Sequence, residues 1–99
     1  MRRGTTPTHI FGTDLDLTDA EVIYVTYQQN GNTLLELTGD RIVVAADHIE
    51  VELTQLDTLA FRQNEKVYIQ IRARFSDGSA VASNVIETTA RMILKEGVI

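Results

Sequence analysis

The segment KVYIQIRARFSDGSAVASNVIETTARMIL, residues 66–94, constrains the fold more than any other part of the chain. Apolar and polar residues alternate along it, which is the period of a β-strand with one buried face. The alternation is interrupted once, at Asp77-Gly78, a dipeptide that favours the tight turn of a β-hairpin. The segment therefore predicts two long antiparallel strands, the second with a bulge or bend at Ser83-Asn84.

The first of these strands divides its side chains cleanly between two faces. The face predicted to be buried carries Val67, Ile69, Ile71, Ala73 and Phe75. The opposite face carries Tyr68, Gln70, Arg72 and Arg74. A regular strand with one apolar face needs a second layer to cover that face, so the pattern predicts a packed β protein.

Other strands follow from runs of β-branched and aromatic residues between turn signals. The expected strands cover residues 8–11, 21–29, 33–38, 41–45, 49–53, 67–75 and 80–94. Asn30-Gly31 is a strong hairpin signal between the second and the third. The period becomes helical only over residues 54–61, where Thr54 is an expected N-cap and Asp57 follows three residues later. Residues 18–21 could form a single helical turn or a loop in which side chains bind their own backbone.

Strands joined by short turns, without a long helix, predict an all-β, antiparallel β-sandwich with an immunoglobulin-like count of about seven strands. The cysteine pair and core tryptophan of antibody domains are missing, because the chain contains neither residue type. The single proline, at position 7, ends a polar segment. We therefore expect a flexible N-terminal arm over residues 1–7, a sandwich domain over 8–95 and a short C-terminal tail over 96–99.

Composition argues against several classes of function. The 99 residues include 9 Lys and Arg against 14 Asp and Glu, giving a net charge of −5. An acidic chain is not expected to bind nucleic acid through a broad phosphate-contacting face. The apolar runs are too short to span a membrane, and the N-terminus lacks the apolar stretch of a signal peptide. With no cysteine, disulfides and thiolate sites are excluded.

No pattern of catalytic or metal-binding residues is recognisable. His9 and His48 have no partner at metal-ligand spacing, and turn histidines are usually solvated. Three aspartates at alternating positions suggest a calcium loop, but the glycine and terminal glutamate of that motif are missing. The other candidates are paired glutamates and turn serines, which fit a solvated surface. The sequence therefore predicts no enzymatic activity, no cofactor and no metal.

Two groups of residues are candidate contacts with other macromolecules. Tyr24 and Tyr68 lie on the strand faces opposite the expected core, and Arg72 and Arg74 accompany Tyr68. A basic and aromatic face within an acidic protein is typical of a contact surface, although cross-strand packing on an outer face is the simpler explanation. Arg2 and Arg3 form the one basic cluster, at the N-terminus.

Several segments resemble a known group of proteins: RRGTTPTHIF, DLTDAEVIYVTYQQNGNTLLEL, LTQLDTLAF, VYIQIRARFSDGSAVASNVI and LKEGVI. Together they are similar to short immunoglobulin-like proteins of tailed phages and prophages of gut Firmicutes, whose genes lie among tail and baseplate genes. The segment DLTDA before an extended strand also resembles the N-terminal immunoglobulin-like domain of phage baseplate upper proteins.

This resemblance implies a structural or interaction module of a phage tail or baseplate, made in the bacterial cytoplasm and incorporated into the virion. Its expected partners are other phage structural proteins or further copies of itself, as a homo-oligomer or within a larger assembly. The termini are expected to contribute to assembly. The alternatives are a carbohydrate- or host-surface-binding domain that uses the tyrosine and arginine face, and a small phage regulator that binds a host protein.

Overall fold

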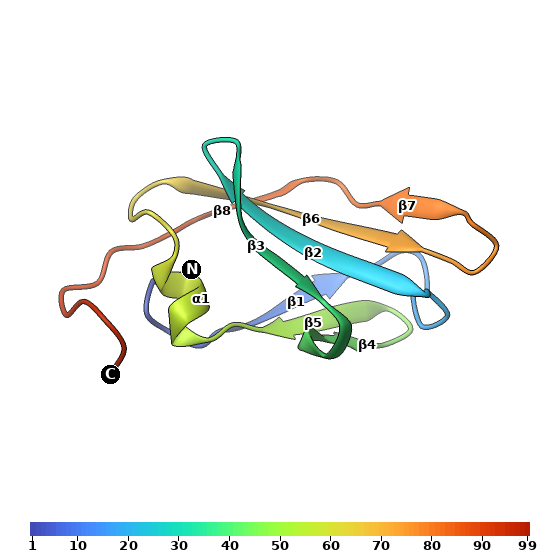
Figure 1. The fold of residues 1–99 in the computed structure, drawn as a ribbon, viewed down its shortest axis with the longest axis horizontal. Helices are drawn as coiled ribbons and strands as arrows, with labels where there is room; N and C mark the ends of the chain where they lie inside the picture. Colours follow the sequence, from blue (N-terminus) through green and yellow to red (C-terminus); the bar gives the residue numbers. More distant parts are fainter.

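The structure, a computed structural model, describes all 99 residues of the chain. It contains eight strands and two short helical elements (Figure 1). In chain order these are β1 (Thr8–Gly12), β2 (Val22–Gln29), β3 (Asn32–Thr38), the 3₁₀ turn η1 (Gly39–Arg41), β4 (Ile42–Val44), β5 (His48–Glu52), α1 (Gln55–Leu59), β6 (Lys66–Arg74), β7 (Ala80–Ala82) and β8 (Ile86–Thr89). No helix in the structure is long and apolar enough to cross a membrane.

The strands form two antiparallel sheets that lie one over the other (Figure 1). The first sheet has the order β1-β5-β4. The second has the order β3-β2-β6-β7, and β8 also pairs with β6. β7 and β8 pair with different parts of β6 and so act as one interrupted strand. Counted in this way, the domain has the seven strands expected from the sequence.

This topology is immunoglobulin-like. In immunoglobulin domains one sheet has the strand order A-B-E-D and the other contains C, F and G, with C′ added beside C in variable-type domains. Here β1, β5 and β4 correspond to B, E and D, whereas β3, β2, β6 and the pair β7 and β8 correspond to C′, C, F and G. The counterpart of strand A is missing from the first sheet. The fold class predicted from the sequence is thus confirmed.

The core lies between the two sheets and contains 16 buried apolar residues. The alternating patterns predicted it well: the expected inward residues of β5 and β6 are all buried, apart from Phe75, which is partly buried and lies beyond the end of β6. Phe61, which follows α1, and Tyr27 of β2 close one end of this core, with ring centroids 5.8 Å apart.

Turns and caps form where the sequence predicted them. Asn30 and Gly31 both have positive φ, as a tight two-residue hairpin turn requires. Thr54 caps α1 and exchanges hydrogen bonds with Asp57 in a capping box. Of the two alternatives for residues 18–21, the structure shows the loop, in which a carboxylate oxygen of Asp16 accepts from the backbone and hydroxyl of Thr18.

The last predicted strand is shorter than expected. It is interrupted after β7, where the Ser83 hydroxyl accepts a hydrogen bond from the backbone N–H of Ile71. It ends at Thr89, which lies opposite Lys66, the first residue of β6. Beyond that point no strand remains to pair with, and after Ala90, which is buried, Met92 and Leu94 are exposed.

The N-terminal segment, which the sequence suggested is a flexible arm, is docked onto the domain. Met1 and Arg3 exchange backbone hydrogen bonds with Thr89 and Arg91, forming a short parallel bridge. Gly4 has a φ of +70°, a backbone conformation that favours glycine over residues with a side chain. This segment is held by hydrogen bonds to residues far along the chain. Composition alone could not reveal such contacts.

Candidate functional site

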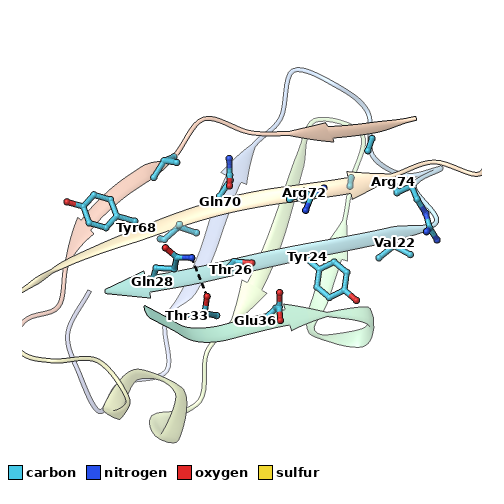
Figure 2. Close-up of a pocket in the computed structure, with 14 residues that line it drawn as sticks. Val22, Tyr24, Thr26, Gln28, Thr33, Glu36, Tyr68, Gln70, Arg72 and Arg74 are labelled. Atoms are coloured by element: carbon cyan, nitrogen blue, oxygen red, sulfur yellow. Dashed lines mark hydrogen bonds between the residues drawn. The ribbon is translucent and has the colours of Figure 1, made fainter. Parts of the chain in front are cut away.

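The outer face of the second sheet brings four of the six predicted contact residues together (Figure 2). The register of β2 against β6 places Tyr24 opposite Arg72, and Gln28 opposite Tyr68. Arg74 lies opposite Val22, one step further along the same face. The alternation within each strand predicted which way these side chains point, but only the pairing of β2 with β6 places Tyr24 among the others. We call this surface the tyrosine–arginine face.

A shallow groove of about 540 Å³ runs over this face. Its walls come from four strands and a loop: Val22, Tyr24, Thr26, Gln28, Thr33, Glu36, Tyr68, Ile69, Gln70, Arg72, Ala73, Arg74, Ala80 and Val85. Sequence reasoning did not single out Gln28, Glu36 or Gln70, although the alternation places all three on outward faces. They join the groove because β2, β3 and β6 are neighbours in the sheet.

The side chains of the groove are anchored to a rigid support. Gln70 donates to the backbone carbonyl of Ser83 at 3.0 Å, and Gln28 donates to the Thr33 hydroxyl at 3.3 Å. β2 and β6 are central strands with hydrogen bonds on both sides. Because the backbone is fixed, a partner would meet a largely preformed surface.

The two tyrosines lie at opposite ends of the groove, as Figure 2 shows. Tyr24 is 40 % exposed and Tyr68 is 39 % exposed, so each ring rests partly on the sheet and presents the rest to solvent. Because Tyr68 faces Gln28, four residues along β2 from Tyr24, the Cα atoms of the two tyrosines are about 14 Å apart at a rise of ~3.4 Å per residue. One sugar ring cannot span that distance, whereas an extended peptide or a protein surface can.

The tyrosine–arginine face carries side chains of both charges, and its arginines differ in how they are paired. Arg72 has no acidic side chain within ion-pair distance, and Arg74 has one, Glu21, at 3.6 Å. Glu36 is the one acidic residue that lines the groove. On the first sheet, by contrast, Glu50 and Glu52 line the corresponding surface groove. Glu87 of β8 lies opposite Tyr68 and pairs with Lys66 at 2.6 Å, so Arg72 is the one charged side chain of β6 on this face without an ion-pair partner.

The remaining two predicted contact residues, Arg2 and Arg3, lie away from this face and are engaged within the chain. The Arg3 guanidinium donates to the carbonyls of Phe61 and Leu59, at 2.6 and 3.2 Å, and pairs with Glu96 at 2.8 Å. Arg2 makes one exposed hydrogen bond, to the carbonyl of Met92. In this structure Arg3 fastens the N-terminal segment to the end of α1.

The histidines lie on the paired strands β1 and β5, three positions apart in register, and have different surroundings. Half-buried His9 lies 2.7 Å from the Tyr27 hydroxyl, and burial lowers the pKa of His9 while it raises that of Tyr27 well above its usual range. Exposed His48 lies beside Asp47, and the hydrogen bond between them raises the pKa of His48 and lowers that of Asp47. No group of three or more His, Cys, Asp or Glu side chains is placed to hold a metal ion.

Comparisons with known proteins add little to this description. No family model and no curated protein matches the chain. Among solved structures, a V domain of amphioxus IgVJ-C2 matches with 11 % identity, covering 94 % of this chain and 97 % of that one, with a TM-score of 0.38. A likeness at that level carries no argument, so the assignment of the fold rests on the order of strands in the two sheets.

Proposed function

We propose that this chain is a non-enzymatic interaction module that binds another protein through its tyrosine–arginine face. The observation that carries the proposal is the pairing of β2 with β6, which sets Tyr24 beside an arginine without an acidic partner on a rigid, exposed sheet. Tyrosine and arginine are the side chains most enriched at the centres of protein interfaces.

The arginines of the face, and the unpaired Arg72 above all, suggest a partner that presents carboxylates. An unpaired Arg72 and a weakly paired Arg74 favour carboxylates, which a guanidinium can bind with two parallel hydrogen bonds. The groove extends over four strands and offers amide groups from Gln28 and Gln70 between the rings. These features fit an acidic, extended segment with an apolar or aromatic residue at each end.

For the identity of the partner, the proposal depends on the resemblance of the sequence to tail- and baseplate-associated phage proteins. We propose that the module is a component of a phage tail or baseplate and that its partner is another virion protein. Its contribution there is geometric, since a rigid sandwich fixes the distance and orientation of the proteins that it contacts.

Capture experiments with matched variants test the binding face. The immobilised chain is exposed to lysate of phage-producing host cells, and bound proteins are identified by mass spectrometry. We expect a virion protein to bind the native chain and to be lost with Arg72→Glu or Tyr24→Ala. Arg62→Glu, which reverses an exposed arginine outside the groove, should leave binding unchanged.

The outcomes separate the two parts of the proposal. Binding that survives Arg72→Glu and Tyr24→Ala would contradict a role for the face. Specific capture of a host protein instead of a virion protein would contradict the phage assembly role and favour the small regulator. Detection of the chain in purified virions with an antibody checks the assembly role independently.

A carbohydrate-binding function is the second candidate, because exposed tyrosines with neighbouring amides also suit sugars. The separation of about 14 Å between the Cα atoms of the two tyrosines, at ~3.4 Å per residue, favours an oligosaccharide over a single sugar. A glycan array with the native chain and Tyr68→Ala distinguishes this function from protein binding. Signals that Tyr68→Ala abolishes would support it, and a flat array would exclude it.

A further inference from the structure

The edge of the first sheet at β1 is open, because no strand pairs with β1 on the side away from β5. β1 pairs with β5 alone. In immunoglobulin domains strand A occupies the position on the other side of this strand. The N-terminal segment that could have formed strand A instead lies beside residues 89–91, at a different part of the molecule.

Alternate residues of β1 direct their backbone groups toward this open edge. Leu53 donates to the carbonyl of Pro7, and Thr13 donates to that of Asp47, so the hydrogen-bonded positions of β1 are the odd-numbered ones. The N–H and C=O groups of the even-numbered residues therefore point away from β5. These residues are Thr8, Ile10 and Gly12.

None of the features that usually protect sheet edges is present in β1. Its sequence, THIFG, contains no lysine, acidic residue or proline, and its pairing with β5 has no bulge. The other edge strands are protected: β4 and β7 have three residues each, and β3 carries Glu36 and lies beside a register shift. β1 is thus the edge best suited to accept another strand.

The side chain of Ile10 gives a second, independent indication. It is 63 % exposed on the outer face of the sheet, directly opposite Glu50. Exposed isoleucine is common, but this one lies in the centre of an unprotected edge strand, where an added strand would place a side chain directly against it.

We infer that β1 pairs antiparallel with β1 of a second copy of this chain, in a symmetric register centred on Ile10. In this register each Ile10 faces its own counterpart and each Thr8 faces Gly12 of the other copy, so every edge-facing backbone group finds a partner. The two three-stranded sheets become one continuous sheet of the two copies. This inference does not depend on the tyrosine–arginine face, which lies on the other sheet and stays free.

The lack of charged side chains along β1 allows a second copy to be the occupant. Two chains of net charge −5 repel one another over most of their surfaces, but the strip formed by β1 carries no acidic or basic side chain other than His9. Burial lowers the pKa of His9, which keeps it neutral at pH 7. Two copies can therefore meet along β1 without placing like charges directly opposite each other.

Sedimentation velocity over a concentration series that extends to the millimolar range tests the pairing. We expect a monomer–dimer equilibrium whose midpoint moves about tenfold or more to higher concentration in Ile10→Lys, since the dimer loses an apolar contact and gains two facing charges. Ile10→Pro should have the same effect, because it removes an N–H that points to the open edge and not to β5. Circular dichroism verifies that both variants fold.

Val43→Lys is the matched control. Val43 is 60 % exposed on the same face and lies opposite the same residue, Glu50, but on the other edge strand. Val43→Lys should leave the midpoint of the monomer–dimer equilibrium unchanged. A chain that stays monomeric throughout the series, or a dimer that Val43→Lys weakens as much as Ile10→Lys, would overturn the inference and leave the edge to a strand of a different protein.

Cysteine variants test the register, because the native chain has no cysteine. Directly opposed residues of a hydrogen-bonded pair have Cα atoms about 5.5 Å apart, within disulfide range. Ile10→Cys should therefore form a disulfide-linked dimer under mild oxidation, and Val43→Cys should not. A mixture of Thr8→Cys and Gly12→Cys should yield the mixed dimer, and position 12 has open space for a side chain. Preferential linkage of Thr8→Cys to itself would contradict the antiparallel register.

Discussion

At the residue scale, His9 is a group whose protonation is linked to folding in the range just below neutral pH. Its Nδ1 lies at hydrogen-bond distance, 2.7 Å, from the hydroxyl of fully buried Tyr27, whose pKa is raised by burial. Burial also lowers the pKa of His9 below its ordinary value of about 6.5. The unfolded chain therefore binds a proton at this position more readily than the folded chain as the pH falls below about 6.5.

We therefore expect His9 to lower the free energy of unfolding as the solution becomes acidic. The contribution of His9 is present above about pH 6.5 and decreases as the pH falls from there toward its lowered pKa. The free energy of unfolding from urea denaturation, measured between pH 7.5 and about pH 5, should decrease less in His9→Gln than in the native chain. Equal decreases in both would contradict this expectation.

His48 requires its own control, because its contribution has the opposite sign. The hydrogen bond with Asp47 raises its pKa, so its stabilising contribution is present in acid and is lost as the pH rises through that raised pKa. His48→Gln should therefore make the acid decrease of the native chain slightly steeper.

Arg3 holds the N-terminal segment in place. Its side chain is only 13 % exposed and binds two carbonyls near the end of α1 as well as a carboxylate. We expect Arg3→Ala to lower the free energy of unfolding by about 1.5–3 kcal/mol, because hydrogen bonds to a charged group are lost and carbonyls keep no donor. Arg2→Ala is the matched control and should change stability by less than about 0.5 kcal/mol. Urea denaturation measures both, and equal effects would contradict the assignment.

At the scale of elements, α1 shows how much a five-residue helix depends on its cap. So short a helix is unstable by itself, and the capping box of Thr54 and Asp57 satisfies backbone donors at its first turn. Thr54→Ala should cost about 1 kcal/mol of stability, whereas Thr54→Ser, which keeps the hydroxyl, should cost much less. Thermal denaturation followed by circular dichroism compares the two, and equal melting temperatures would contradict the role of the hydroxyl.

Elements also show where prediction from sequence succeeded and where it failed. β5 and β6 were predicted closely because one buried face imposes a strict period of two on the residues themselves. The break between β7 and β8 was placed correctly at Ser83, but the end of β8 was not. That end depends on where β6 begins, and β6 is far away in sequence.

At the scale of the whole molecule, one core joins both sheets. The 16 buried apolar residues come from each sheet and from the segments after β1 and α1, so neither sheet can keep its inner face dry without the other. We therefore expect unfolding to be a single cooperative transition, without a stable half-unfolded state. Urea curves from far-ultraviolet circular dichroism and from tyrosine fluorescence, which is sensitive to buried Tyr27, should coincide. Separate midpoints would contradict a single core.

The sequence by itself determined the period of each strand, the positions of the tight turns, the cap of α1 and the outward direction of each candidate side chain. These are local properties, set by backbone geometry and by the alternation of neighbouring residues. Tertiary structure alone decided that Tyr24 lies beside Arg72, that the N-terminal segment is docked and that β1 has an open edge. Strand order and register depend on which distant segments pack together, and a pattern within one segment carries no information about its neighbour in the sheet.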